Sequence, residues 1–276
     1  MTYNEFKSGA ILRLSNVCEN PTFEAECIIM HFSGFKRNEL LLNRASVIPG
    51  DVLEKLNQAI DLRLQRHPLQ YIIGEWEFFG LRMFCGQGCL IPRPETELLA
   101  EIAIKNLPRN GKLLDLCTGS GCVAISTLAN TKGTTAIAAD ISEGALEVAK
   151  ENAGFMGVSD RVEFRLCDVL KEPLCEKCFA VLSNPPYVSE ECYLTLEKEI
   201  YKEPKIAFLG GKDGGDFYRA LTPLYKNIIA EDGFIAYEIG YDQADIMVEI
   251  AKENGMSLGI IRDLGGRVRV AVLRRK

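Results

Sequence analysis

The chain has 276 residues, of which 47% are hydrophobic and 25% charged, a composition that suits one globular α/β domain with a small additional domain. Its formal net charge of −6 argues against a protein that follows a nucleic-acid backbone, because phosphate binding usually requires a basic face. No apolar run reaches the roughly 18 residues needed to span a bilayer. The first residues also lack the basic and apolar segments of a secretory signal, so we expect a cytoplasmic protein without membrane contact.

Ten cysteines in a chain of this length do not indicate a disulfide framework when no export signal is visible. Cys175 and Cys178 have the spacing of half a zinc site, but a second such pair is missing. Only His31 and His67 are available as imidazole ligands. We therefore expect a solvated loop at this pair and no metal.

Residues 1–68 are predicted to form a helical N-terminal domain. Pro21 and Pro49 stand where helices favour a proline, because the first helical position needs no backbone N–H. Four leucine and isoleucine side chains recur at helical spacing and predict one buried stripe. These are Leu53, Leu56, Ile60 and Leu64.

Residues 69–92 are predicted to link this domain to the next one. Their composition becomes typical of strands, with Tyr71 to Ile73 and Phe78-Phe79 separated by Gly74 and Gly80. We interpret the segment as a β-hairpin.

Residues 93–276 alternate between strand and helix patterns, with an amphipathic helix at 142–154 as one example. This alternation predicts a mostly parallel sheet with helices on both faces and a ligand site beyond the carboxyl ends of the strands. The predicted strands are 112–116, 135–139, 162–167, 179–183, 234–239, 258–261 and 268–273.

A glycine-rich turn follows the first of these strands. Gly119-x-Gly121-x-x-Ala124 permits a tight turn and the close approach of a ligand to the backbone. The next strand ends at Asp140, whose carboxylate can bind both hydroxyls of a ribose. These features fit S-adenosylmethionine (SAM) and NAD equally well, and a turn without a ligand is a third interpretation.

Asp168 stands at the end of the third strand. There it can accept a hydrogen bond from an adenine amino group, or it can simply cap a helix or a turn. The residues alone favour neither role.

The fourth strand runs into the motif Asn184-Pro185-Pro186-Tyr187, in which two prolines stiffen the turn. The Asn184 side-chain oxygen and the Pro185 carbonyl then form two fixed acceptors that match the two donors of a planar NH2 group. Tyr187 offers a ring face for the same group. An alternative is a proline-rich loop with a buried tyrosine.

The two acceptors suit methyl transfer to an amide nitrogen, whose lone pair is normally delocalised into the carbonyl. Holding both N–H bonds favours a pyramidal nitrogen and stabilises the positive charge that develops on it. Alignment of the nitrogen with a sulfonium methyl group supplies further rate enhancement. No ionisable base is required. We therefore predict methylation of a planar amide nitrogen.

Several further segments complete a family pattern. They are Gln70 to Gly74, Ile91 to Glu97, Glu203-Pro204, Gly210 to Gly214, Glu238 to Gly240 and Asp263 to Arg267. With Asn184 to Tyr187, they make the chain resemble the protein-(glutamine-N5) methyltransferases of the PrmC/HemK family along nearly its whole length. The Pro-Arg-Pro-Glu-Thr-Glu segment at 92–97 is far more specific to this family than Asn-Pro-Pro-Tyr, which DNA adenine-N6 methyltransferases share.

The resemblance implies a class I SAM-dependent methyltransferase: a Rossmann-like, mostly parallel, seven-stranded sheet with a small helical N-terminal domain. Its implied substrate is the glutamine of the Gly-Gly-Gln motif in peptide-chain release factors, which the helical domain helps to grip. Residues 92–97 are implied to close over the methionine end of SAM. Nothing calls for direct nucleic-acid binding or a dimer, and we expect a monomer.

The site residues follow by motif match. Those implied to contact SAM are Cys117, Thr118, Gly119, Ser120, Gly121, Asp140, Asp168, Val169 and Asn184. Those implied to hold the glutamine amide are Asn184, Pro185, Pro186 and Tyr187, with Asn184, Pro185 and Tyr187 assigned to catalysis.

Two positions depart from the family pattern. Many relatives have glycine in place of Cys117, so the backbone angles of the turn are open to change. Some relatives have an aromatic residue in place of Val169, so we expect weaker stacking on adenine but retained binding.

Three other functions remain as alternatives. A nucleic-acid adenine-N6 methyltransferase also uses Asn-Pro-Pro-Tyr, but it needs a base-flipping pocket and a basic groove. A NAD-linked oxidoreductase would use the glycine turn and leave Asn-Pro-Pro-Tyr unexplained. A non-catalytic SAM-binding module is the third, although every expected site residue is present.

Overall fold

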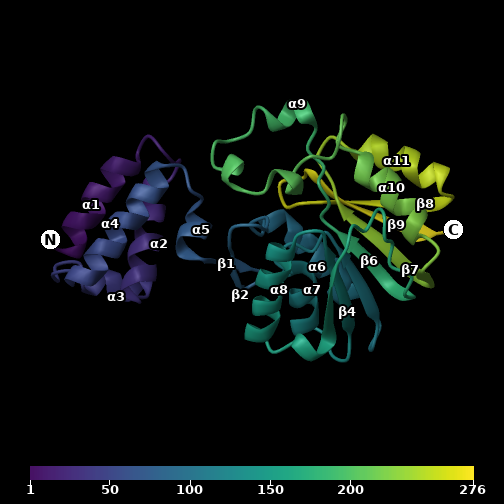
Figure 1. Cartoon of the computed structure of the whole chain (residues 1–276), viewed down its shortest axis with the longest axis horizontal. Helices are drawn as coiled ribbons and strands as arrows, with labels where there is room; N and C mark the ends of the chain where they lie inside the picture. Colours follow the sequence, from purple (N-terminus) through teal and green to yellow (C-terminus); the bar gives the residue numbers. More distant parts are fainter. The chain divides into compact units, whose positions relative to one another are not determined.

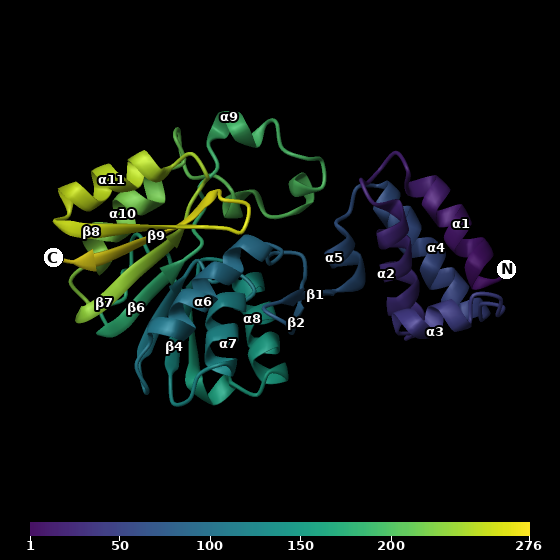
Figure 2. The same cartoon turned by 180° about the vertical axis from the view of Figure 1, so that it is seen from behind.

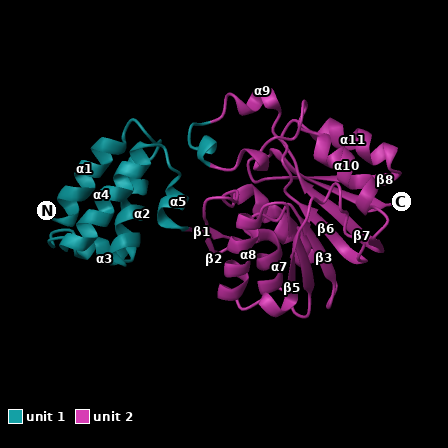
Figure 3. Cartoon of the chain, viewed as in Figure 1, with its two compact units in different colours: residues 1–74, 197–202 teal, residues 75–196, 203–276 magenta.

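The computed structural model describes all residues 1–276, and these divide into two compact units (Figure 3). The helical unit comprises residues 1–74 together with 197–202. The sheet unit comprises residues 75–196 and 203–276. The predicted borders at 68 and 92 therefore differ from this division, because the helical unit continues to residue 74 and takes in six residues from a distant loop.

The helical unit contains five α-helices and a short 3-10 helix from the 197–202 segment. They are α1 (Tyr3–Leu14), α2 (Pro21–Ser33), α3 (Arg37–Leu42), α4 (Gly50–Leu64), α5 (Leu69–Ile73) and η3 (Ile200–Lys202). Helix α2 starts at Pro21 as predicted, whereas Pro49 is the residue before the first turn of α4. Leu56 and Ile60 of the predicted stripe are fully buried, and Leu53 and Leu64 are half-buried.

The predicted hairpin is present but shorter than expected. Strands β1 (Glu75–Phe78) and β2 (Leu81–Phe84) pair in antiparallel fashion around Phe79 and Gly80. Both turn residues have positive φ, 54° and 70°, which is the type I′ form that matches strand twist.

The expectation that Tyr71 to Ile73 belong to this hairpin is wrong, because they lie in α5. Pro68 precedes the helix, and Gly74 ends it in the left-handed conformation by donating its N–H to the Gln70 carbonyl. These two capping signals override the strand preference of the apolar residues between them.

The sheet unit is built on a seven-stranded sheet with the order β5-β4-β3-β6-β7-β9-β8. The first five of these are parallel, and β9 is antiparallel to both of its neighbours. All seven strands coincide with predicted ones to within a few residues, so the mostly parallel sheet is confirmed. They are β3 (Lys112–Leu116), β4 (Thr135–Asp140), β5 (Val162–Leu166), β6 (Cys178–Ser183), β7 (Ile229–Glu238), β8 (Met256–Arg262) and β9 (Val268–Arg275).

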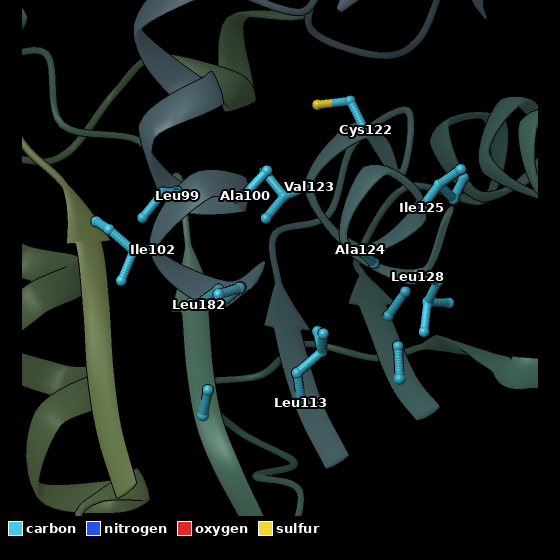
Figure 4. Packing of buried hydrophobic residues seen from close by; sticks show 14 of the residues in the cluster. Leu99, Ala100, Ile102, Leu113, Cys122, Val123, Ala124, Ile125, Leu128 and Leu182 are labelled. Atoms are coloured by element: carbon cyan, nitrogen blue, oxygen red, sulfur yellow. The ribbon is translucent and has the colours of Figure 1, made fainter. Parts of the chain in front are cut away.

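Helices cover both faces of this sheet (Figures 1 and 2). One face packs against α6 (Glu97–Asn106), α7 (Cys122–Ala129) and α8 (Glu143–Phe155), and the other packs against α10 (Asp216–Tyr225) and α11 (Ala244–Glu253). Alternate strand residues enter the two cores: Leu113 contacts the α6–α7 side, as Figure 4 shows, and Leu114 the other. The remaining elements are short. They are η1 (Pro94–Thr96), η2 (Ser159–Arg161), α9 (Glu190–Tyr193) and η4 (Lys205–Ala207).

The strand order reverses at β3, which has β4 on one side and β6 on the other. Ligands of open α/β sheets bind beyond the carboxyl ends of the strands at such a switch point. Cys117, Asp140 and Asn184 lie at or just after these three strand ends. None of the helices combines the length and apolarity that crossing a bilayer requires.

Candidate active site

The buried side chain of Asp115 fixes the glycine turn after β3 by accepting two hydrogen bonds. Its Oδ2 accepts hydrogen bonds from the Thr118 hydroxyl at 2.6 Å and from the Ala124 N–H at 3.1 Å. Burial raises the pKa of this carboxyl to about 7, although both hydrogen bonds act in the opposite direction. The turn is therefore anchored to the first helical turn of α7 through one buried side chain.

The two glycines of the turn have different physical roles. A Cβ on Gly121 would come within 2.7 Å of the Ile125 side chain and 3.1 Å of the Ala149 Cβ, so this glycine permits close packing of α7 and α8. A Cβ on Gly119 would meet no atom within 4 Å. Gly119 therefore faces open space, where a ligand can approach its backbone.

Cys117 retains the backbone conformation that a glycine would favour at its position. Its φ is +57°, in the left-handed region, where an L-residue costs about 1 kcal/mol relative to glycine. Cys117 therefore adopts a left-handed conformation despite its side chain. The thiol is packed against the core on the α10–α11 side, and burial raises its pKa far above the usual range.

Asp140 is fixed at the end of β4 by two backbone amides. Oδ2 accepts from the Gly119 N–H at 2.8 Å, and Oδ1 accepts from the Ser142 N–H at 2.9 Å. Burial raises the pKa of this carboxyl, and the amide bonds oppose the rise. A carboxylate offers about four lone-pair sites, so two remain for a ligand.

A cavity of about 260 Å³ opens beyond the three strand ends. Seven of the predicted site residues line it: Cys117, Gly119, Asp140, Asp168, Val169, Asn184 and Pro186. Leu90, Ile206 and Phe217 contribute apolar walls that the sequence interpretation missed. Leu90 stands in a loop, Ile206 in the 3-10 helix η4 and Phe217 at the start of α10, so no periodic pattern marked them in advance.

A smaller cavity of about 30 Å³ is also lined by Cys117, Gly119 and Asn184. Thr118 and Ser120 line it as well, together with Pro92, Arg93 and Thr96 of the Pro-Arg-Pro-Glu-Thr-Glu segment. Arg93 forms an ion pair with Glu203 at 2.5 Å. The same Glu203 carboxylate accepts the Ile91 N–H at 3.0 Å, which fixes the backbone ahead of the segment.

Three predicted site residues, Gly121, Pro185 and Tyr187, line neither cavity. Gly121 packs between helices, as described above. The Tyr187 phenol is instead hydrogen-bonded to Glu238 Oε1 at 3.0 Å. Its ring contacts the core on the α10–α11 side.

Asp168 performs the turn role that was considered from the sequence. Its Oδ1 accepts the Leu170 N–H at 3.1 Å, and its Oδ2 pairs with Lys171 at 2.8 Å. The lysine pair lowers the pKa of this carboxyl. The neighbouring Val169 is buried against the core and also lines the cavity.

Asn184 is connected to the Pro-Arg-Pro-Glu-Thr-Glu segment. Its Nδ2 donates to Thr96 Oγ1 at 3.2 Å, and the Thr96 hydroxyl donates to Glu238 Oε2 at 2.6 Å. The sequence assigned no site role to Glu238. The sequence did contain one indication of such a role, because Glu238 ends a buried strand and glutamate is rarely buried without a partner.

The Cys175 and Cys178 pair, which was expected to lie in a solvated loop, does so only at Cys175. Cys175 is exposed in a loop, and Cys178 is buried at the start of β6. No group of three or more histidine, cysteine or acidic side chains has an arrangement that could hold a metal ion.

A larger groove, of about 1030 Å³, runs along α6 and β8. Its polar groups are already engaged: Glu97 accepts the Phe79 N–H, Glu95 pairs with Arg269, and Glu101 pairs with Lys105. It contains none of the strand-end groups, so the smaller strand-end cavity is the candidate active site.

The sheet order, the switch-point cavity and the glycine turn define a class I SAM-dependent methyltransferase. A family model described as "Methyltransferase small domain" matches residues 94–207, and one described as "PrmC N-terminal domain" matches residues 8–74. The ribosomal protein L11 methylase of Lactobacillus delbrueckii subsp. bulgaricus shares the fold, with a TM-score of 0.51 and 21% identity over 70% of this chain and 84% of that one.

Relatives named release factor glutamine methyltransferase match most of the chain. One from Neisseria gonorrhoeae is 34% identical over 99% of this chain and 97% of its own length. One from Clostridium acetobutylicum is 37% identical over 78% of each chain. The chain belongs to the release factor glutamine methyltransferase family, and the resemblance inferred from its motifs is confirmed.

Proposed function

We propose that this chain transfers the methyl group of SAM to the side-chain nitrogen of the glutamine in the Gly-Gly-Gln motif of release factors. The observation that carries the proposal is that Asn184 and Pro186 line the same cavity as Gly119 and Asp140. A substrate amide and a nucleoside cofactor would therefore meet in one space. The names of the family relatives supply the substrate class.

The residues of the cavity fit SAM. Gly119 leaves open space beside the turn, and Asp140 has lone pairs left for ribose hydroxyls after binding two backbone amides. Val169 provides an apolar surface for adenine, and Asp168 keeps its carboxylate at the cavity wall. When bound, SAM supplies an electrophilic methyl group on a sulfonium.

The protein groups act on the amide by binding and orientation. The Asn184 side-chain oxygen and the Pro185 carbonyl accept the two N–H bonds of the glutamine amide and stabilise the positive charge that develops on its nitrogen. The nitrogen lone pair then points along the line of displacement, which makes the transfer effectively unimolecular. Tyr187 is partly buried and supports this motif through its hydrogen bond to Glu238. The apolar walls exclude water.

The helical unit, which matches the N-terminal family model, is proposed to contribute to release-factor binding. The monomeric state, the cytoplasmic location and the lack of direct nucleic-acid binding stay predictions.

Incubation with methyl-labelled SAM and a purified release factor tests the proposal. We expect label on the tryptic peptide that contains Gly-Gly-Gln and none on a release factor whose glutamine is replaced by alanine. Label in DNA or RNA with none in the release factor would instead support the adenine-N6 alternative. A thermal shift with NAD and none with SAM would support an oxidoreductase.

A further inference from the structure

Four side chains behind the candidate active site form one continuous hydrogen-bonded group, which we call the Glu238 network: Asn184, Thr96, Glu238 and Tyr187. Its three links measure 3.2 Å from Asn184 to Thr96, 2.6 Å from Thr96 to Glu238 and 3.0 Å from Tyr187 to Glu238. All four residues belong to the sheet unit. The network thus connects both polar side chains of the Asn-Pro-Pro-Tyr motif to one carboxylate.

The chemistry of these groups fixes the direction of each hydrogen bond. An ionised carboxylate only accepts, so the Thr96 hydroxyl gives its single proton to Glu238 Oε2 and Tyr187 gives its own to Oε1. The Thr96 oxygen is then left as an acceptor. It can satisfy the amide nitrogen of Asn184 but not the amide oxygen.

We propose that Glu238 is a positioning residue that acts through Thr96 to hold the Asn184 side chain with its nitrogen inward and its oxygen toward the substrate. Through Tyr187 it fixes the other side chain of the same motif. The inference rests on the proposed function for its catalytic consequence. Its structural content, the orientation of one side-chain amide, does not depend on the substrate.

Burial of Glu238 and Thr96 makes the orientation of the Asn184 amide depend on the network. Glu238 is 1% exposed and Thr96 is 2% exposed, so water does not replace a lost partner. Burial raises the pKa of Glu238 to about 7, against the opposing effect of the two hydrogen bonds. The ionised form that fixes these bond directions therefore predominates above this pH, where turnover is measured. Beyond the network, the charged groups that act on this carboxyl are Glu95, which raises its pKa, and Arg269, which lowers it.

An inverted Asn184 would present NH2 to a substrate NH2 group. Two donors would then face each other, and the glutamine amide would lose one of its two acceptors. Loss of a single pre-organised hydrogen-bonding group of this kind typically slows turnover by about 100- to 1,000-fold. A freed amide still spends part of its time in the productive orientation. We therefore expect turnover to fall by about 10- to 100-fold when the Thr96 hydroxyl, which accepts from Asn184 Nδ2, is removed.

Thr96→Val removes the hydroxyl with little change in volume and is the principal test. We expect the rate of methyl transfer to the release factor to fall at least about tenfold, with the Kd for S-adenosylhomocysteine within about threefold of the unaltered protein. Thr96→Ser keeps the hydroxyl and should restore most of the rate. Turnover of Thr96→Val equal to that of the unaltered protein would overturn the proposal.

Thr127→Val is the matched control. Thr127 is also fully buried and also donates one hydroxyl hydrogen bond, to the Val123 carbonyl at 2.8 Å, but this bond lies within α7 and does not involve the network. Its turnover should be unchanged. If Thr96→Val does not fold, Tyr187→Phe removes the other donor to Glu238, and a turnover equal to that of the unaltered protein would then count against the network.

A second measurement does not need the substrate. In protein labelled with ¹⁵N-asparagine, the Asn184 side-chain NH2 signals should exchange slowly with water and exchange faster in Thr96→Val. Identical exchange in the two proteins would overturn the inference. An unaltered protein that binds SAM, shows this difference and fails to methylate a release factor would contradict the proposed function alone.

Discussion

Asp140 should determine the affinity for the cofactor, and Asp140→Asn is the sharpest test. The carboxylate already accepts the Gly119 N–H at 2.8 Å through Oδ2 and the Ser142 N–H at 2.9 Å through Oδ1. Asparagine has one oxygen in place of two. If that oxygen keeps the bond to Gly119, the new NH2 group faces the Ser142 N–H, and one ribose hydroxyl loses its acceptor.

A hydrogen bond to a charged group contributes about 1.5–3 kcal/mol, which corresponds to a rise in Kd of about 10- to 150-fold. Isothermal titration calorimetry with S-adenosylhomocysteine measures this without turnover. Asp160→Asn, at an exposed position in η2, is the control and should bind normally. A Kd within about twofold of the unaltered protein, in an Asp140→Asn variant that melts normally, would refute the assignment of Asp140.

Three further predictions concern other parts of the chain. Asn184→Ala removes one proposed acceptor and should lower turnover by about 100- to 1,000-fold with an unchanged melting temperature; near-normal turnover would show that the acceptor is misassigned. Asp115 has a folded pKa of about 7 against an ordinary 3.8, so the folded state binds a proton between these values that the unfolded state does not. Its contribution to the free energy of unfolding therefore falls as pH rises from about 4 to about 7. Urea titrations at several pH values measure this dependence. Asp115→Asn should remove this fall, and an identical pH dependence in the variant and the unaltered protein would contradict the assignment. Arg63 pairs with Glu24 at 2.6 Å and Glu199 at 2.9 Å and is 5% exposed, so Arg63→Met should destabilise the helical unit by about 3 kcal/mol. Arg13→Met, which breaks an exposed pair, is its control and should have little effect, so equal losses in the two variants would contradict the role of burial.

The strands could be predicted because their signal is local. Each is a short apolar run bounded by turn residues, and burial on both faces of a parallel sheet requires such runs. The glycine turn and Asn184 were found for a related reason, since strand ends at a switch point collect the site. In α5, by contrast, the apolar residues resembled a strand, and two residues outside the run, Pro68 and Gly74, decided the outcome.

The contacts between distant segments could not be predicted in the same way. Thr96 and Glu238 are 142 positions apart, and no local pattern relates them. In the sequence, Glu238 could be recognised as part of a family segment, but nothing indicated which residues it would bond to. Gly121 was assigned to the cofactor because its spacing fits the motif, whereas its packing against Ile125 and Ala149 depends on how α7 and α8 approach each other.

The membership of residues 197–202 in the helical unit has a practical consequence for attempts to separate the two units. The backbone crosses between them three times, at 74–75, 196–197 and 202–203, so no single cut yields two intact pieces. A shortened chain that begins after Gly74 would keep Glu199 but lose both arginines that neutralise it, Arg63 and Arg66. Removing the helical unit cleanly therefore requires replacing the 197–202 loop as well.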